Sequence, residues 1–383
     1  MVKFFYWSPC LDKVGTYNAV KNSALAINKY SKNRFKIFII NACGEWNDEV
    51  EFFNKNNINV VKLNFNYFTF LPKTGFFGSR LSNIIIFIIS FFPLIKILIK
   101  EKPDYFIGHL ITSLPILIFS LFNLKSKFIL RISGFPRLNK FRKFFWILFQ
   151  KKIYKVTCPS RDLRMQLLDL NIFPSDKLFF LPDPIINVNK FVLKNKKKFF
   201  NDKCIKKKYF IAVGRLTKQK NFNYLINEFN EFLKMNTNYD LLIFGEGEER
   251  NKLQLKINNL NLEKKIFLMG YSSQIYYYMK NAKALILSSL WEDPGFVLIE
   301  AAFCNLFIVS SNCKNGPEEF LNHGEGGMLF ESNKEDELNK KLQKFLIMDK
   351  KKLDSMKMTA KLNTSNYTLF SHYKFFNDII FNH

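Results

Sequence analysis

The chain has 383 residues, of which 48% are hydrophobic and 17% aromatic. This length and apolar content indicate two domains of ordinary size, each with a core of its own, and exclude a largely disordered chain. The formal net charge is +26, but Phe, Ile, Asn and Lys are abundant together, as in an AT-rich genome, so charge alone does not identify a nucleic-acid-binding protein. The charge is uneven along the chain: residues 1–190 carry 28 basic and 11 acidic residues, which makes the first half the more basic one.

The cysteines and the amino terminus limit the cellular setting. The six cysteines form no CxxC pair, and no histidine lies at metal-ligand spacing, so neither a disulfide framework nor a zinc site is predicted. The segment Met1 to Trp7 lacks the order of charged, apolar and small residues that marks a signal peptide, and it is predicted to be a first strand. We therefore expect a cytoplasmic location without export.

Short apolar runs alternate with helix-length stretches along the chain. The predicted strands of the first half are residues 3–7, 35–41, 60–63, 105–108, 128–132 and 156–158, and the predicted helices include 20–30 and 114–124. A second series of strands is predicted at 209–213, 240–244, 266–269, 284–288 and 307–309. This alternation predicts two doubly wound α/β domains, with a linker near residues 184–205 and binding sites at the carboxyl ends of the strands.

Two stretches of the first domain are candidates for membrane contact. Residues 84–95 form an apolar run of 12 that is flanked by basic residues and is too short to span a bilayer. Residues 140–155 mix six basic side chains with five Phe and Trp side chains, a composition typical of a helix that lies on an anionic membrane. The alternative for both stretches is a core helix with a solvated basic face.

A pair of glutamates, Glu292 and Glu300, is separated by a Pro-Gly turn and the start of an apolar helix. The amides of Gly295, Phe296 and Val297 at that helix start can bind an anion, while the two carboxylates bind different parts of one elongated ligand. A nucleotide sugar has this character. The spacing alone is weak, because 18 glutamates give about one such pair by chance.

The second domain begins with a candidate diphosphate site. Gly214, Arg215 and Lys220 follow the predicted strand 209–213, and the two cations can bind a diphosphate from two sides, although ordinary surface charge is the alternative. Gly245 lies in a glycine-rich turn that is similar to a nucleotide-binding loop, but the neighbouring acids would repel phosphate. An ordinary turn is therefore the other interpretation of Gly245.

The order of these motifs is more specific than any one of them. The series is Gly214-Arg215 with Lys220-Asn221, then 245–247, 267–270, 288–292, 300–302 and 315–320. Over about residues 205–345 it resembles the carboxyl-terminal domain of the GT-B glycosyltransferases of family 4, the retaining nucleotide-sugar group. The resemblance implies two Rossmann-like domains that face each other across a cleft. It implies an acceptor-binding domain at 1–190, a nucleotide-sugar-binding domain at 191–365, and a helix at 366–383 that crosses back to the first domain.

The resemblance also implies roles for the candidate residues of the second domain. Arg215 and Lys220 would bind the donor diphosphate and stabilise the leaving nucleoside diphosphate. Glu300 would accept hydrogen bonds from the ribose, and Glu292 would approach the transferred sugar. The alternatives are that Glu300 is a helix acid and that Glu292 is a loop carboxylate. Gly214, Gly245 and the 295–297 amides would contact the donor.

In the first domain the resemblance assigns Gly15 to the donor phosphate and His109 to catalysis at the cleft. A hydrogen-bonded structural histidine is the alternative for His109. Ser133-Gly134 stands where some relatives carry a catalytic-pocket histidine, so this chain departs from the family there. No Asp-x-Asp motif occurs, so we expect side-chain cations in place of a metal, with no cofactor and with the nucleotide sugar as co-substrate.

The leading hypothesis is a transferase of a hexosyl or N-acetylhexosaminyl group, with a UDP-sugar favoured as donor and a GDP-sugar as the other choice. Its expected acceptor is a lipid-linked glycan in surface polysaccharide or lipopolysaccharide biosynthesis. We expect the protein to be peripheral at the inner face of the cytoplasmic membrane, in contact with an anionic surface and without a nucleic-acid partner. The alternatives are a nucleotide-sugar epimerase or hydrolase on the same fold, a basic nucleic-acid-binding protein, and an inactive assembly partner.

Overall fold

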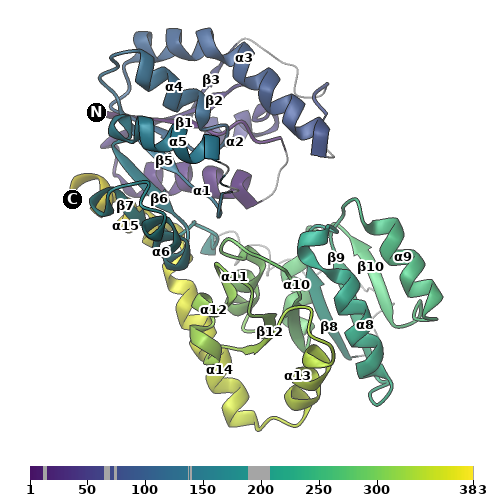
Figure 1. The fold of residues 1–383 in the computed structure, drawn as a ribbon. Helices are drawn as coiled ribbons and strands as arrows, with labels where there is room; N and C mark the ends of the chain where they lie inside the picture. Colours follow the sequence, from purple (N-terminus) through teal and green to yellow (C-terminus); the bar gives the residue numbers. More distant parts are fainter. Residues whose placement is uncertain are drawn as a thin grey trace. The chain divides into compact units, whose positions relative to one another are not determined.

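The chain folds into two compact units (Figure 1). The computed structural model describes residues 1–11, 15–63, 70–72, 76–136, 138, 140–188 and 208–382. The first unit comprises Met1–Ile185 together with Leu369–His383, and the second comprises Ile186–Thr368. The division thus lies at Ile185, a little before the residue 190 that the sequence suggested. Most of the linker expected at 184–205 lies outside the described residues.

The first unit contains a seven-stranded parallel sheet with the order β3-β2-β1-β4-β5-β6-β7. Its strands are β1 (Val2–Trp7), β2 (Phe35–Asn41), β3 (Asn59–Lys62), β4 (Tyr105–Gly108), β5 (Lys127–Arg131), β6 (Lys155–Cys158) and β7 (Leu178–Phe180). The first six were predicted within a residue or two. The last was not predicted, because its three residues are too few to show a period.

Strand β1 shows why this sheet is buried on both sides. Alternate side chains of a strand point to opposite faces. Phe4 and Tyr6 join one hydrophobic core, and Phe5 and Trp7 join the other. Four consecutive aromatic residues therefore supply both layers, which is typical of a parallel strand covered by helices on each face.

Helices cover both faces of the first sheet. They are α1 (Gly15–Tyr30), α2 (Val50–Lys55), α3 (Phe76–Glu101), α4 (Ser113–Leu121), α5 (Lys140–Phe149), α6 (Arg161–Asp169) and the carboxyl-terminal α15 (Leu369–Phe381). Residues of α1, α2 and α15 pack in the core that contains Phe4, and residues of α3 to α6 pack in the core that contains Phe5. Helix α15 packs against α1, and its Phe376 ring meets Phe4 at a centroid distance of 5.3 Å.

Two predictions about the candidate membrane segments need correction. The apolar run 84–95 is part of a much longer helix, and within it Arg80–Glu101, 22 residues, is long and apolar enough to cross a bilayer. The prediction that this segment is too short was wrong, because it counted only the run between Asn83 and Lys96, whereas the helix continues past both residues. Length and composition alone do not make a membrane span, since core helices meet the same criteria. The second segment, 140–155, is not a single helix. Helix α5 ends at Phe149, and a short 3-10 turn at Gln150–Lys152 leads into β6.

The second unit contains a six-stranded parallel sheet with the order β10-β9-β8-β11-β12-β13. Its strands are β8 (Lys208–Val213), β9 (Tyr239–Phe244), β10 (Ile266–Gly270), β11 (Ala284–Leu287), β12 (Phe307–Ser311) and β13 (Met328–Phe330). Its helices are α8 (Phe222–Leu233), α9 (Arg250–Asn259), α10 (Ile275–Asn281), α11 (Phe296–Phe303), α12 (Pro317–Phe320), α13 (Glu337–Leu346) and α14 (Lys350–Asn363). The prediction of two doubly wound α/β domains is confirmed.

Candidate active site

The loops after β8, β9 and β10 meet at the carboxyl edge of the second sheet. Gly214 N–H donates to the Phe244 carbonyl, and Gly245 N–H donates to the Gly270 carbonyl, each at 2.9 Å. Gly245 has φ +137°, and a Cβ there would lie 1.9 Å from the Gly214 carbonyl oxygen. Only glycine allows so close an approach together with this backbone conformation. Gly245 therefore shapes the loops, whatever its contact with a ligand.

Gly214 makes room for the side chain of Lys220. A Cβ at Gly214 would lie 2.9 Å from Cε of Lys220, so the lysine stem crosses directly over the end of β8. Lys220 ends a short 3-10 turn, and its carbonyl accepts a hydrogen bond of 2.8 Å from the Ser288 hydroxyl. The cation is thus anchored to the ends of two neighbouring strands, β8 and β11.

Lys220 forms a buried ion pair with Glu292. The ammonium contacts Oε1 of Glu292, and the exposed fractions of the two side chains are 14% and 7%. The Ser289 hydroxyl donates a second hydrogen bond of 2.5 Å to the same carboxylate oxygen. A charge-assisted pair with an additional donor is strong, and it holds both charged groups in fixed positions. The structure thus brings together the cation predicted to bind diphosphate and the carboxylate predicted to approach the sugar.

The turn between the two glutamates begins helix α11. Gly295 precedes the helix with φ +89°, a left-handed conformation that favours glycine. A Cβ at Gly316 would lie 2.2 Å from the Pro294 carbonyl oxygen, so the loop after β12 packs tightly beneath this turn. The amides of Phe296 and Val297 lie in the first turn of α11, where no helical carbonyl is available to them. This helix start has the partial positive charge that suits an anion.

The second glutamate, Glu300, is held by a tyrosine from the preceding helix. Tyr276 of α10 donates its hydroxyl proton to Oε1 of Glu300 at 3.0 Å. Burial, followed by the charge of Glu300, raises the pKa of Tyr276 far above its usual range, so the phenol stays protonated and remains a donor. Glu300 is partly buried and has a defined orientation.

Arg215, the second predicted diphosphate ligand, is exposed and forms no ion pair with any residue that the structure describes. Arg215 follows Gly214 directly and so lies at the end of β8, the same strand end over which the Lys220 side chain passes. Gly214, Arg215, Lys220, Gly245 and Glu292 thus follow the carboxyl ends of adjacent strands of one sheet.

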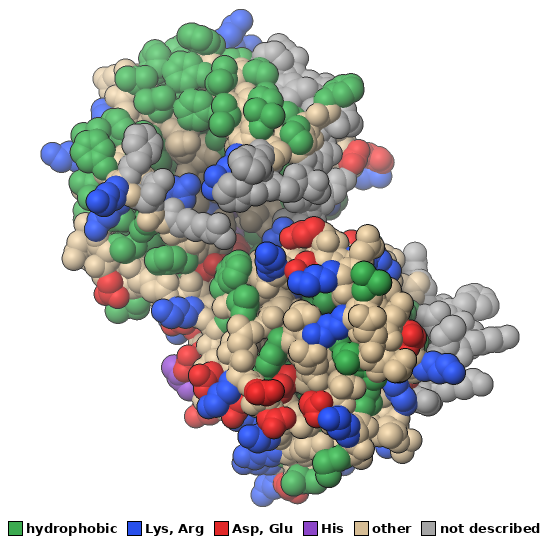
Figure 2. Space-filling model, turned by 45° about the vertical axis from the view of Figure 1, so that its right-hand side comes forward, with side chains coloured by type: hydrophobic (Ala, Val, Ile, Leu, Met, Phe, Trp, Pro, Cys, Tyr) green, Lys and Arg blue, Asp and Glu red, His purple; other side chains and the backbone are tan. Residues whose placement is uncertain are grey.

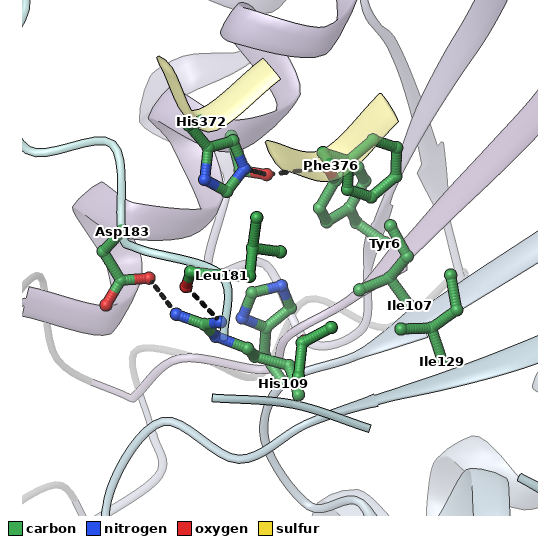
Figure 3. A pocket seen from close by; sticks show the side chains of 11 residues that line it. Tyr6, Ile107, His109, Ile129, Leu181, Asp183, His372 and Phe376 are labelled. Carbon is green, nitrogen blue, oxygen red and sulfur yellow. Dashed lines mark hydrogen bonds and ion pairs between the residues drawn. The ribbon is translucent and has the colours of Figure 1, made fainter. Parts of the chain in front are cut away.

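The first unit contains the other two predicted residues. Gly15 is the first residue of α1, but the chain just before it, 12–14, lies outside the described residues. His109 follows β4 and lines a small internal cavity with Arg131 and His372 (Figure 3). Burial, together with the nearby Arg131 charge, lowers the pKa of His109 well below its usual value, so the ring is neutral. Its Nδ1 has no hydrogen-bond partner in the described parts of the chain, and its catalytic role stays a prediction.

A series of buried hydrogen bonds beside His109 joins α15 to the rest of the first unit. His372 Nδ1 lies 2.7 Å from the Pro182 carbonyl and Nε2 lies 2.8 Å from the Ser23 hydroxyl. Since a carbonyl can only accept, Nδ1 carries the proton, Ser23 donates to Nε2, and the Tyr6 hydroxyl donates to Ser23 at 2.9 Å. In the same cavity, whose lining includes Leu181 and Asp183 (Figure 3), Arg131 donates to Asp183 at 2.6 Å and to the Leu181 carbonyl at 2.7 Å.

The buried hydrogen bonds of His372 predict that the first unit is less stable at acid pH. Burial lowers the pKa of His372 to about 3, so the folded state stays neutral while the unfolded state takes up a proton below pH 6.5. The contribution of His372 to stability is therefore complete above pH 6.5 and is lost as the pH falls, by about 2 kcal/mol at pH 5. We expect the urea concentration at the midpoint of unfolding, measured by tryptophan fluorescence, to be lower at pH 5 than at pH 7.5.

His372→Gln, which cannot titrate, serves as the control for this prediction and should show a smaller pH shift. His109 is also buried and neutral, so some shift of the midpoint with pH will remain. Three of the four tryptophans, at positions 7, 46 and 146, belong to the first unit, so the signal reports mainly on it. Equal midpoints at the two pH values would contradict the assigned protonation.

Sequence reasoning missed two residues of the candidate site. Ser289 and Tyr276 each donate a hydrogen bond to one of the two glutamates. Ser289 lies three positions before Glu292, which is a weak local signal. Tyr276 is one of three consecutive tyrosines, and no pattern in the sequence distinguishes it from Tyr277 and Tyr278.

Part of the chain is similar to known glycosyltransferases. The family described as glycosyl transferases group 1 matches residues 194–362. An uncharacterized glycosyltransferase of Methanocaldococcus jannaschii is 30% identical over 259 residues, which is 60% of this chain and 61% of the relative. An N-acetylgalactosamine-N,N'-diacetylbacillosaminyl-diphospho-undecaprenol 4-alpha-N-acetylgalactosaminyltransferase of Campylobacter jejuni is 33% identical over 153 residues, which is 40% of this chain and 41% of that enzyme. The chain thus spans about three fifths or less of these curated relatives.

The fold itself is similar to that of a solved structure along its whole length. Anabaena HepE in complex with UDP and glucose has a TM-score of 0.74 at 14% identity, and the match covers 100% of both chains. At this identity the likeness concerns the fold alone. Residues 194–362 thus match the group 1 glycosyl transferases, and the structure has the two Rossmann-like parallel-sheet domains of a GT-B fold.

Proposed function

We propose that this protein is a retaining glycosyltransferase that moves a hexosyl or N-acetylhexosaminyl group from a nucleotide sugar to a lipid-linked glycan acceptor. The observation that carries the proposal is the cluster at the carboxyl edge of the second sheet. There the cation Lys220, the carboxylate Glu292 and the start of α11 meet within a group 1 glycosyl transferase domain. Such a cluster suits a ligand with a negative diphosphate between two hydroxyl-rich ends.

The chemistry assigned to these residues follows from the charge that develops when the glycosidic bond breaks. Negative charge grows on the diphosphate of the leaving nucleotide, and preorganised donors at that point lower the barrier. Arg215 would supply paired guanidinium donors, Lys220 an ammonium, and α11 the amides of Phe296 and Val297. These cationic and amide donors would take the place of a metal ion. Glu300 would accept hydrogen bonds from the ribose hydroxyls.

Binding of diphosphate would give Lys220 a second partner. In the structure the ammonium contacts only one oxygen of Glu292, and an ammonium has three donor hydrogens. Lys220 can therefore bind a phosphate oxygen while it keeps its contact with Glu292. The carboxylate of Glu292 would in turn accept hydrogen bonds from hydroxyl groups of the sugar. The two residues serve as binding and orienting groups in this proposal, not as an acid and nucleophile pair.

The identity of donor and acceptor rests on relatives. HepE is described with bound UDP and glucose, which favours a UDP-sugar, while a GDP-sugar is the other candidate. The Campylobacter enzyme is named for a diphospho-undecaprenol acceptor, which is a lipid-linked glycan. We infer the same class of acceptor here, in the synthesis of a surface polysaccharide or lipopolysaccharide. An acceptor of this kind would place the enzyme at the inner face of the cytoplasmic membrane.

The proposal is tested by transfer from a panel of UDP- and GDP-sugars to undecaprenyl-diphosphate-linked acceptors. We expect one donor to be consumed only when an acceptor is present, and Arg215→Ala to reduce turnover at least about 100-fold, since it removes a donor to the leaving diphosphate. Retention of anomeric configuration is read from the product by NMR. Donor consumption without any acceptor would favour the epimerase or hydrolase alternative, and full activity of Arg215→Ala would refute the site assignment.

A further inference from the structure

Helices α3, α4 and α5 lie on the same face of the first sheet. They connect β3 to β4, β4 to β5 and β5 to β6, and right-handed crossovers that advance in one direction put their helices on one side. Consistent with this, Leu94 of α3, Ile116 of α4 and Trp146 of α5 join one core with Phe5. Helix α4 contacts both of the other two helices. Their outer surfaces therefore form one continuous side of the unit.

The outer surface of α3 is apolar, which is the reverse of what water-exposed helices show. Leu81, Ile84, Ile88, Phe92 and Ile99 are each at least 53% exposed, and Phe92 reaches 77%. Their spacings of three, four, four and seven residues place them along one stripe of the helix. A solvent-facing stripe of a helix in a globular domain is normally polar. These large side chains need an apolar partner.

The outer surface of α5 continues the same pattern with cations added. Phe144 and Leu148 are 63% and 56% exposed, while Trp146 on the inner side is buried. Lys143 lies one residue before Phe144 and is exposed as well. Figure 2 shows the hydrophobic side chains gathered on the upper unit, with lysine and arginine at the margins. In the second unit, exposed hydrophobic residues such as Leu255 in α9 and Ile347 just after α13 lie at separate places in the chain.

The charge of this part of the chain is almost entirely of one sign. Residues 52–161 contain 18 Lys and Arg but only two acids, Glu101 and Asp104. Exposed lysines lie at the end of α3, at positions 96 and 100, and after α5, at positions 151 and 152. Cations beside a wide apolar surface complement a bilayer with anionic headgroups, in which hydrocarbon and phosphate lie next to each other. A nucleic acid would need exposed stacking rings in place of the isoleucines of α3.

The buried side of α3 decides how the helix meets a membrane. Ile86, Leu94 and Leu98 are at most 1% exposed and pack in the core of the first unit. If α3 crossed a bilayer, these side chains would leave that core and uncover the sheet. A helix with one face in the protein core and one apolar face outside lies along the membrane interface.

From these observations we propose that the outer surfaces of α3 and α5 form a membrane-docking face that lies on an anionic phospholipid bilayer. Ile88 and Phe92 enter the boundary between headgroups and acyl chains, and the lysines contact lipid phosphates. The benefit to catalysis rests on the proposed function, because docking brings the enzyme to a lipid-linked acceptor. The docking itself depends only on the surface of the first unit.

The test is co-flotation of the full chain with phosphatidylcholine vesicles, with and without phosphatidylglycerol. We expect binding to the anionic vesicles that weakens with salt. The variant Ile88→Glu/Phe92→Glu should lower the vesicle partition coefficient at least about tenfold, since two apolar anchors are replaced by repelled charges. The variant Lys143→Gln/Lys151→Gln/Lys152→Gln should lose the preference for anionic vesicles. The matched control Leu255→Glu/Ile347→Glu changes two exposed apolar side chains of the second unit, 62% and 86% exposed, and should bind like the original protein.

Two outcomes would overturn the docking face. These are absence of flotation of the original protein with anionic vesicles, and equal vesicle binding of the Ile88→Glu/Phe92→Glu variant. If that variant also loses self-association, the surface is assigned to a contact between copies. Circular dichroism checks that the variants fold. UDP binding, measured without vesicles, should be the same in all of them, and its absence would count against the proposed function while leaving the flotation result intact.

Discussion

Replacement of Lys220 by methionine is expected to lower sugar transfer at least about 100-fold, the loss typical when one preorganised donor to developing negative charge is removed. Gly214 has no side chain and so leaves room for the stem of Lys220 over the end of β8. The contact with Glu292 then holds the ammonium there. The ammonium therefore has a fixed position, which a neighbouring cation cannot easily take. Turnover with the preferred nucleotide sugar is the measurement.

The same substitution is expected to destabilise the second unit by about 3 kcal/mol, because it leaves a buried carboxylate without its counter-charge. Glu292 has only 7% of its side chain exposed, and the Ser289 hydroxyl alone cannot neutralise it. The double variant Lys220→Met/Glu292→Gln removes both charges and should recover most of this stability. It should not recover transfer, since the diphosphate would still lack its ligand.

The double variant separates the two roles of the ion pair. Stability is followed by urea unfolding, and activity by turnover at saturating donor. Lys218→Met, an exposed lysine in the same 3-10 turn, is the matched control and should change neither quantity. Recovery of transfer in the double variant would show that Lys220 acts only by neutralising Glu292, and the diphosphate role would then be abandoned.

The second large effect is expected at Glu300. A carboxylate that accepts hydrogen bonds from hydroxyl groups contributes about 1.5–3 kcal/mol, so Glu300→Ala should raise the donor KM roughly 10- to 150-fold. Tyr276→Phe removes the hydroxyl that orients Glu300 and should raise the donor KM about fivefold with kcat nearly unchanged. The split between KM and kcat distinguishes ground-state binding from catalysis.

The neighbouring tyrosine provides the control for this effect. Tyr277→Phe makes the same chemical change on the same helix, at a ring that is 48% exposed, and should leave the donor KM as it was. UDP affinity measured by calorimetry should be lowest for Glu300→Ala, intermediate for Tyr276→Phe and unchanged for Tyr277→Phe. If Tyr276→Phe and Tyr277→Phe behave alike, the hydrogen bond to Glu300 does not position the carboxylate for the donor.

Particular elements show how far the sequence predicts the structure. Strands such as β1 and β12 are predictable because a short, continuous apolar run bounded by turn residues is typical of a buried parallel strand. The glycines at 214 and 245 and the acid pair at 292 and 300 stand out through their order along the chain. The length of α3 is not predictable in this way, because polar Asn83 and Lys96 look like the ends of the apolar run, yet the helix continues past both. The end of α5 is hidden as well, because aromatic and basic residues continue past it.

What the sequence by itself determined is the alternation of strand and helix and the residue types at each strand end, since both are local properties of the chain. The two-domain parallel-sheet fold follows from them and is confirmed. Tertiary structure alone decided the partners: Lys220 with Glu292, Glu300 with Tyr276, and His372 with Pro182 and Ser23. These contacts join residues 24 to 349 positions apart. Only the packing of strands and helices brings such distant residues within hydrogen-bonding distance, and burial then gives the contacts their strength and shifts the pKa of His372.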